Sequence, residues 1–351
     1  MLQSLWNIIA IPLGYIMRWC YLFVTDIINM PMPYVFALFL FTVITKVILF
    51  PLAVKQQKST AKMSAFQPIM ADIQKTYAKD KNRQQQEMVK LQEEMGYNPM
   101  AGCLPMLIQF PILFGLIEVI YRPLTYMLKI PAELVTLLST KVATITGVEL
   151  TAATSRMIET GIIEQVKTNA GAFTDLFAKY PSAMQQIQDL NMSIGSINLW
   201  ENPKLEFSWM LLIPLFSVVT MLLSQIITLK ASGQDSMGGG SMKMMTIMMS
   251  VMFAVFSFMY PAGFSLYWGF QNIVLIFQSM LLRKMIDPDK YKAAALAQME
   301  ENKKNKKKKA VKTVKMIDEK SGEVIEKNIS LSDLEKLRLQ KARELDDERY
   351  N

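Results

Sequence analysis

The chain has 351 residues, of which 51% are hydrophobic, with a formal net charge of +8 and no histidine. Histidine is the commonest general base and the commonest metal ligand, so its absence argues against most enzymes; we expect no catalytic residue, no metal and no other cofactor. Cys20 and Cys103 lie in separate apolar segments, and we interpret them as packing residues. Several apolar stretches approach the roughly 20 residues that cross a bilayer, which predicts an all-α integral membrane protein.

The first predicted element is a helix within residues 1–30. Its apolar pattern is interrupted by Pro12, Arg18 and Asp26, and it lacks the basic start of a secretory signal peptide. A helix that lies in the membrane interface fits this pattern best, because Arg18 and Asp26 can reach the lipid headgroups. A sixth membrane span is the alternative.

Five transmembrane helices are predicted within residues 31–285, which we expect to form one core. The predicted spans are residues 33–54, 100–128, 207–229, 242–260 and 264–282. Only Pro261, Ala262 and Gly263 separate the last two spans, so these must be antiparallel neighbours.

Two long polar segments interrupt the spans. Residues 55–97 carry apolar residues at steps of three and four on both sides of a turn at Asp80, which predicts a helical hairpin outside the membrane. Residues 129–206 form an insertion that contains short helical patterns at 172–179 and 184–190. This insertion is long for a loop, and we expect it to have some structure of its own.

The last segment, residues 286–351, is a basic tail with six lysines between positions 303 and 309. Such a run attracts polyanions, either ribosomal RNA or anionic lipid. A capping pattern that begins at Ser332 predicts a short solvated helix near the end of the chain, and a disordered tail is the alternative.

The basic residues also predict the orientation in the membrane. The hairpin at 55–97 has eight lysines or arginines, whereas the insertion at 129–206 has six basic and eight acidic residues. By the positive-inside rule, the hairpin and the tail are cytoplasmic, and the N-terminus and the insertion lie outside the cell. We therefore expect a multi-pass membrane protein with its C-terminus in the cytoplasm.

Lys46 is the one charge inside the first predicted span. A lysine at the centre of a membrane helix costs roughly 2.5 to 3.5 kcal/mol on insertion scales. One explanation is that its long stem lets the ammonium reach the cytoplasmic surface. The other is that Lys46 faces a water-filled cavity, which the neighbouring Thr42 and Thr45 favour.

Other polar residues within the predicted spans are candidates to line such a cavity. With Lys46 we name Thr42, Thr45, Gln109, Gln225, Gln271 and Asn272, and more broadly Glu118, Thr228, Ser250, Ser257 and Gln278. Each of them could instead form a hydrogen bond between helices. The fourth span is rich in methionine, which is typical of surfaces that adapt to different partners and also of ordinary lipid-facing helices.

Three stretches resemble the YidC family of membrane protein insertases. Residues 98–111 are similar to the most specific motif of the family, with Asn-Pro, Gly-Cys, Pro and Gln-x-Pro in series. Residues 244–278, which contain the turn Tyr-Pro-Ala-Gly, resemble the last two spans of the family, and residues 50–68 resemble the end of its groove helix. The large periplasmic domain of some members is absent, as in the shorter Gram-positive form.

The resemblance implies five helices around a hydrophilic groove that is open to the cytoplasm. Nascent membrane proteins would enter this groove, and their apolar parts would slide along Met248, Met252 and Leu107 into the lipid bilayer. The resemblance also implies a place in the bacterial inner or plasma membrane. There the protein would act alone or with the secretory translocon, and its tail would contact the ribosome. Lys46 stands where the family usually has arginine, which favours the cavity over the surface-reaching explanation.

Two other functions compete with an insertase on the residues alone. A secondary transporter could use a buried lysine for coupling, but it predicts internal repeats, and we find none. An anchored scaffold whose tail binds nucleic acid or lipid would leave Lys46 unexplained.

Overall fold

Most of the residues that the computed structural model describes are helical, and the described residues are 2–95, 104–151, 154–204, 206–231, 240–309, 311–317, 324–330 and 339. They belong to two compact units. The first unit comprises residues 1–64 and 100–288, and the second comprises residues 65–99 and 289–351. All the predicted membrane spans belong to the first unit.

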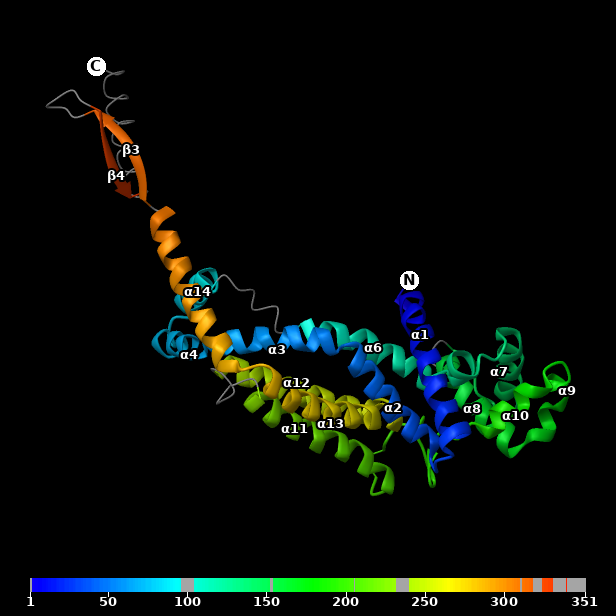
Figure 1. Ribbon diagram of the computed structural model, residues 1–351. Coiled ribbons are helices and arrows are strands. Elements are labelled where there is room, and N and C mark those ends of the chain that lie inside the picture. The colour runs from blue at the N-terminus through cyan, green and yellow to red at the C-terminus, as the bar shows by residue number, and fades with distance from the viewer. Residues whose placement is uncertain are drawn as a thin grey trace, which may run out of the picture. The chain divides into compact units, whose positions relative to one another are not determined.

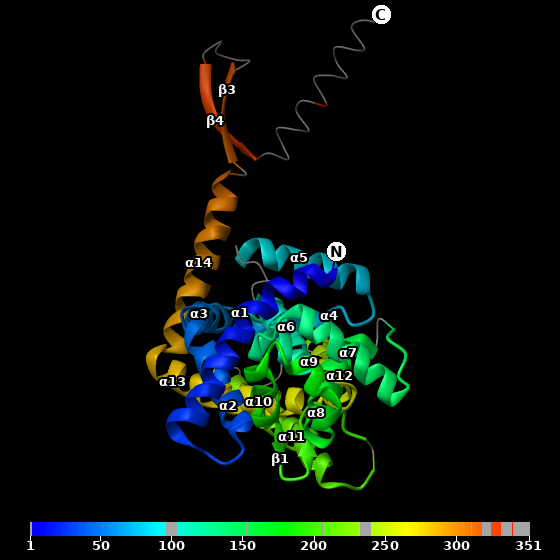
Figure 2. The same cartoon turned by 90° about the vertical axis from the view of Figure 1, so that its right-hand side faces the viewer.

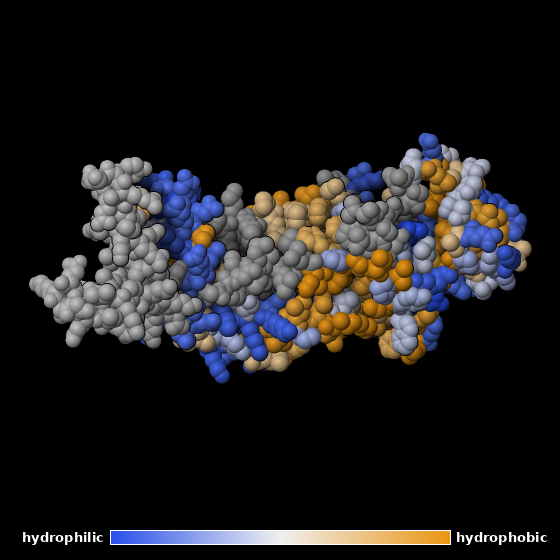
Figure 3. Space-filling model, turned by 90° about the horizontal axis from the view of Figure 1, so that it is seen from above, coloured by the Kyte–Doolittle hydropathy of each residue, from blue (hydrophilic) through white to orange (hydrophobic). Residues whose placement is uncertain are grey.

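Six helices form the body of the first unit (Figure 1): α2 Pro33–Ile48, α3 Phe50–Ser64, α6 Leu104–Tyr121, α11 Leu212–Ala231, α12 Gly240–Met259 and α13 Ala262–Met285. Helix α13 is central, because it packs against α2, α6, α11 and α12. The outward faces of α11, α12 and α13 expose large apolar residues such as Leu222, Val255 and Phe277. Figure 3 shows hydrophobic residues gathered over this body, and an exposed apolar surface of this kind fits contact with lipid.

The class of protein is confirmed in outline: it is a largely helical chain with helices that can cross a membrane. Among the described residues, Ile8–Ile28 and Trp209–Lys230 are long and apolar enough to do so singly, and Ile108–Tyr121 and Ile247–Met259 are shorter apolar helices. Two small antiparallel hairpins of strands, which were not predicted, accompany the helices. The number of spans stays a prediction.

The predicted first span, residues 33–54, is broken. Helices α2 and α3 are long and apolar enough to cross a membrane only as a pair, and they meet at an angle of 62°. Pro51 lacks the N–H that would continue the hydrogen bonds of α2, and its ring disturbs the preceding turn. Helix α3 then continues to Ser64 within the first unit, so the predicted start of the hairpin at residue 55 falls inside a helix.

The insertion at 129–206 folds around apolar residues of its own, including Ile163, Phe173 and Ile187. Its elements are α7 Ala132–Thr146, α8 Thr154–Thr168, η4 Ala170–Phe173, α9 Thr174–Phe177, α10 Pro181–Asp189, β1 Ser193–Ile194 and β2 Ile197–Asn198. The end of the insertion holds the start of α13, because the Gly263 N–H donates to Leu199 O at 2.7 Å. The sequence patterns indicated α9 and α10 but not α7 and α8.

The N-terminal helix α1, Leu2–Leu22, continues into η1, Phe23–Ile28, and packs on α6 and on η3, Leu124–Leu128. Arg18 donates to the backbone oxygens of Met127 and Leu128 at 3.3 and 3.1 Å. Figures 1 and 2 both show α1 running across the direction of α11, α12 and α13. The length and composition of Ile8–Ile28 would suit a crossing, and the interfacial placement of this helix stays a prediction.

Gly14 lets α1 approach η3 closely, and this contact leads to a prediction. A Cβ at Gly14 would lie 2.5 Å from the backbone oxygen of Tyr126, so Gly14→Ala is expected to destabilise the protein by roughly 1 to 3 kcal/mol. Thermal unfolding of the purified protein in detergent measures the effect. The control is Gly115→Ala, whose Cβ would meet the movable end of Leu13 at 2.7 Å. Equal effects of the two substitutions would contradict the prediction.

The second unit contains a helical hairpin and the tail. The hairpin consists of α4, Gln67–Thr76, and α5, Lys81–Met95, and Asp80 begins α5 by accepting the Arg83 N–H at 2.9 Å. The tail consists of α14, Pro288–Lys309, and an antiparallel pair, β3 Val311–Ile317 and β4 Val324–Ser330, which the sequence did not predict. The helix expected after Ser332 lies outside the described residues.

Candidate functional site

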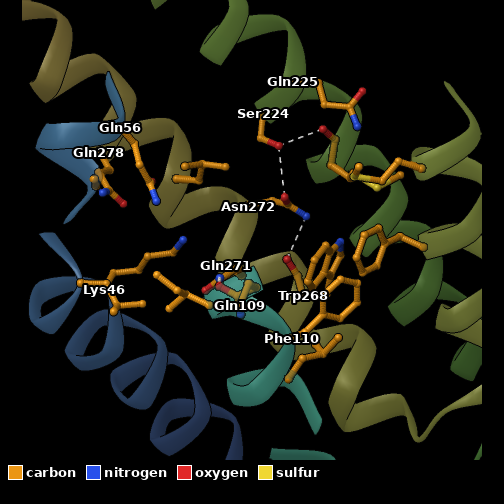
Figure 4. Close-up of a pocket in the computed structure, with 18 of the residues that line it drawn as sticks. Lys46, Gln56, Gln109, Phe110, Ser224, Gln225, Trp268, Gln271, Asn272 and Gln278 are labelled. Carbon is orange, nitrogen blue, oxygen red and sulfur yellow. Dashed lines mark hydrogen bonds between the residues drawn. The ribbon is translucent and has the colours of Figure 1, made fainter. Parts of the chain in front are cut away.

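A cavity of about 340 Å³ lies among the six helices of the body of the first unit. We call it the Lys46 cavity. One part of its lining is apolar and includes Leu52, Phe110, Met249 and Leu275. The polar part, most of which Figure 4 labels, consists of Lys46, Gln56, Gln109, Ser224, Gln225, Ser250, Gln271, Asn272 and Gln278.

Among the described residues, Lys46 contributes the only charged side chain of this lining. It lies in the last turn of α2, where the free carbonyl groups of the helix end favour a positive charge. Figure 4 shows its side chain extending from α2 into the cavity. Within the described part of the chain, no carboxylate forms an ion pair with Lys46. Its ammonium is therefore available to a negative group that enters the cavity.

Amide side chains continue the polar lining from Lys46 along α6 and α13. Gln271 donates to the side-chain oxygen of Gln109, and Gln109 donates to the hydroxyl of Tyr267 at 3.0 Å. The side-chain oxygens of Gln271 and Gln278 and the indole N–H of Trp268 are buried without a hydrogen-bond partner among the described residues. Buried polar atoms of this kind are costly unless they find a partner. The cavity therefore offers both acceptors and a donor to a polar chain.

The other polar residues connect helices as well as line the cavity. Ser224 of α11 donates to Asn272 of α13 at 3.1 Å, and Asn272 donates to Trp268 O at 2.9 Å. Gln225 of α11 donates to Ser250 of α12 at 2.8 Å. Both explanations that the sequence left open for these residues, cavity lining and hydrogen bonding between helices, therefore apply together.

Thr42 and Thr45 were expected to line the cavity, and the structure corrects this. Both are buried, and their hydroxyls donate to the backbone oxygens of Leu38 at 2.7 Å and of Thr42 at 2.9 Å. A threonine in a helix often satisfies its hydroxyl in this way, so a helical position near Lys46 does not by itself place the hydroxyl in the cavity. Of the broader candidates, Glu118, Thr228 and Ser257 also lie outside the lining.

The apolar candidates are placed differently from one another. Met248 is 68% exposed on the outside of α12, and Met252 packs half-buried on the core. Neither lines the cavity, whereas their neighbour Met249 does. The side chain of Leu107 lies outside the described residues. Met248 thus faces the surroundings of the helix body, where lipid contact explains it.

Two polar lining residues were absent from the candidates. Gln56 was assigned to the hairpin, because the break at Leu49 and the continuation of α3 were not foreseen. Ser224 precedes Gln225 in an apolar span, and its position beside a candidate amide was the available signal. A single serine is common in membrane helices, so this signal is weak.

An aromatic stack marks one end of the cavity. The rings of Phe253 and Trp268 lie 4.1 Å apart at an interplanar angle of 17°, and Phe264 stacks on Trp268 at 6.4 Å. Phe253 and Trp268 line the cavity, and Trp268 is the lining residue of α13 nearest to the start of that helix. Beyond this stack the start of α13 is buried against the insertion.

Comparison with known proteins identifies the family. The model of the family described as 60Kd inner membrane protein matches residues 24–290, which include every residue that lines the Lys46 cavity. The chain belongs to this family of YidC-type membrane protein insertases. It is 28% identical over 281 residues to the membrane protein insertase YidC of Clostridium perfringens, covering 79% of this chain and 89% of that protein.

Other YidC relatives match to different extents. The membrane protein insertase YidC 2 of Listeria innocua is 26% identical over 300 residues, which cover 84% of this chain and 78% of the relative. The YidC of Brucella suis is 40% identical over 110 residues, but these cover only 31% of this chain and 17% of that longer protein. The likeness to the Clostridium and Listeria proteins thus extends over most of both chains.

Proposed function

We propose that this chain inserts membrane proteins into the bilayer and that the Lys46 cavity receives the polar segments of its clients. The observation that supports this most is the position of Lys46, a cation without a carboxylate partner among the described residues, in a cavity that is polar on one part and apolar on another. Family membership supports the general activity.

The cavity would lower, in two ways, the free-energy barrier that a polar segment meets when it enters the membrane. Its amide groups, such as Gln109 and Gln271, can replace part of the water that the segment loses, and the ammonium of Lys46 can attract acidic side chains. Phe110 and Met249 give apolar client residues a surface to follow toward the lipid. Binding of this kind requires no covalent step, and the sequence has no phosphate-binding loop, so we propose an insertase that is not an enzyme.

We further propose five spans, formed by the α2–α3 pair, α6 with η3, α11, α12 and α13, with α1 in the interface. The N-terminus and the insertion at 129–206 would then face outward, and α4, α5 and the tail would face the cytoplasm. Clients would arrive from the ribosome or from the secretory translocon. Removing residues 286–351 is expected to reduce cosedimentation with ribosomes, and unchanged cosedimentation would exclude the tail as the contact.

Site-specific crosslinking of a client tests the proposed path. A photoreactive residue in place of Asn272, which lines the cavity, is expected to crosslink to a ribosome-bound client whose polar segment is only partly translocated. The matched control replaces Leu223, which is exposed on the outside of the neighbouring helix α11. Crosslinks to the polar segment from Leu223 and none from Asn272 would show that clients do not use the cavity.

A further inference from the structure

A second cavity, separate from the Lys46 cavity, lies between α1 and α2. Its volume is about 500 Å³, and its lining is almost entirely apolar. Ile16 and Trp19 contribute from α1, and Phe23 contributes from the start of η1. Leu40 and Ile44 contribute from α2. Trp19 is 77% exposed, and Tyr15 at the rim is also exposed. Exposed aromatic residues beside an apolar hollow are typical of the level of the lipid headgroups in a membrane.

Two positive charges lie at the Tyr15 side of this cavity. The ammonium of Lys129 lies 3.8 Å from the centre of the Tyr15 ring. Arg18 is one turn of α1 further on, and its guanidinium donates to the backbone of Met127 and Leu128, immediately before Lys129. Partial burial, and then the positive charge of Arg18, lowers the pKa of Lys129. No ion pair joins either cation to a carboxylate in the described ranges, so the two charges lack a negative partner there.

We propose that this cavity binds an anionic phospholipid of the membrane, with one acyl chain between α1 and α2 and the phosphate beside Lys129 and Arg18. The apolar lining matches a hydrocarbon chain, and the two cations match the charge of the headgroup. Arg18 keeps N–H groups beyond the one that binds the backbone oxygens, and Lys129 has three donors. A bound lipid would fill the gap between α1 and α2 and fix the interfacial helix to the helix that carries Lys46.

Quenching of tryptophan fluorescence by brominated lipid tests the site, because Trp19 lines the cavity. The full chain is reconstituted in phosphatidylcholine vesicles that contain increasing fractions of brominated phosphatidylglycerol or brominated phosphatidylcholine. The signal of Trp19 is the difference between the wild-type protein and Trp19→Phe. We expect half-maximal quenching at an at least fivefold lower fraction of the anionic lipid.

Removing the charge of Lys129 then tests whether this residue causes the preference for the anionic lipid. Lys129→Gln is expected to shift the phosphatidylglycerol curve about fivefold toward higher fractions, because a basic residue near an anionic surface contributes roughly 1 kcal/mol. The phosphatidylcholine curve is expected to stay unchanged, which also shows that the fold is intact. The matched control is Lys179→Gln, an exposed lysine of the insertion. Superimposed wild-type curves, or an anionic preference that is as large in Lys129→Gln as in the wild type, would overturn the proposal. It rests on the proposed membrane placement of α1 and not on client insertion, which Lys46 variants test separately.

Discussion

Insertion of a small membrane protein into liposomes is expected to fall at least about tenfold when Lys46 is replaced by alanine, and to be retained when it is replaced by arginine. A tenfold loss corresponds to about 1.4 kcal/mol. This is less than the roughly 2.5 to 3.5 kcal/mol that a lysine costs at the centre of a membrane helix, so the effect is plausible only because Lys46 lies in a polar cavity and not against lipid. Arginine keeps the charge in the last turn of α2, whereas alanine removes it.

Two further variants separate charge from shape in this experiment. Lys46→Gln keeps a long polar side chain in the cavity without the charge, and it is expected to lose activity as alanine does. Lys55→Ala removes a lysine of α3 that is exposed and does not line the cavity, and it is expected to insert clients normally. Normal insertion by Lys46→Ala and Lys46→Gln would exclude a cationic path for the client.

Arg122→Met is expected to destabilise the fold by roughly 3 kcal/mol at pH 8, because it leaves a buried carboxylate without its cation. The side chain of Glu159, in α8, is only 1% exposed, and Arg122 Nε donates to it at 3.3 Å. The backbone N–H of Thr125 donates to the same carboxylate at 3.0 Å. These contacts hold α8 of the insertion to the end of α6. Thermal unfolding with and without the substitution measures the loss.

The loss in Arg122→Met should shrink as the pH falls. Burial raises the pKa of Glu159, against the opposing hydrogen bonds from Thr125 and the charge of Arg122. A carboxyl whose pKa is higher in the folded than in the unfolded protein adds stability as the pH falls through the folded pKa, since the folded state then binds the proton more tightly. Without Arg122 this pKa rises further, so protonation recovers more stability in the variant than in the wild type.

Two controls define this prediction. The double variant Arg122→Met, Glu159→Gln removes the uncompensated charge and is expected to recover most of the stability at pH 8. Lys141→Met breaks the ion pair with Asp175, whose side chain is 65% exposed, and a solvent-exposed pair contributes about 1 kcal/mol or less. A loss in Arg122→Met that is independent of pH would show that packing, and not charge, explains it.

The helices of the body could be predicted because the signals for a membrane helix, a long apolar stretch and basic residues at its ends, are local in the sequence. The sequence indicated α11, α12 and α13 closely, and the turn between α12 and α13 followed from three residues. The break near Leu49 could not be predicted, although Pro51 lies in this apolar run. A proline in a membrane helix can be tolerated when neighbouring helices satisfy the freed backbone groups, so it does not by itself predict a bend. The strands β3 and β4 lie among charged residues without the alternation that predicts a strand.

The lining of the cavity could be predicted only in part, because a polar side chain in an apolar span can bond to its own backbone, to another helix or to a group in the cavity. Gln109, Gln225, Gln271 and Asn272 line the same cavity as Lys46, since amide side chains within a span must find polar neighbours away from lipid. Thr42 and Thr45 satisfy their short side chains on their own helix. Whether a polar side chain bonds within its own helix or to another helix depends on the distance to that helix, which the sequence does not give.

The aromatic stack at the end of the cavity bears on how this protein itself is assembled. Phe253, Phe264 and Trp268 lie within one helical hairpin, so their contacts are local in sequence and can form as soon as α12 and α13 pair. The cavity, by contrast, needs α2, α3, α6 and α11 as well, and contacts between distant segments form later than local ones. The aromatic stack can therefore form from α12 and α13 alone, whereas the polar interior is complete only when all six helices are packed together.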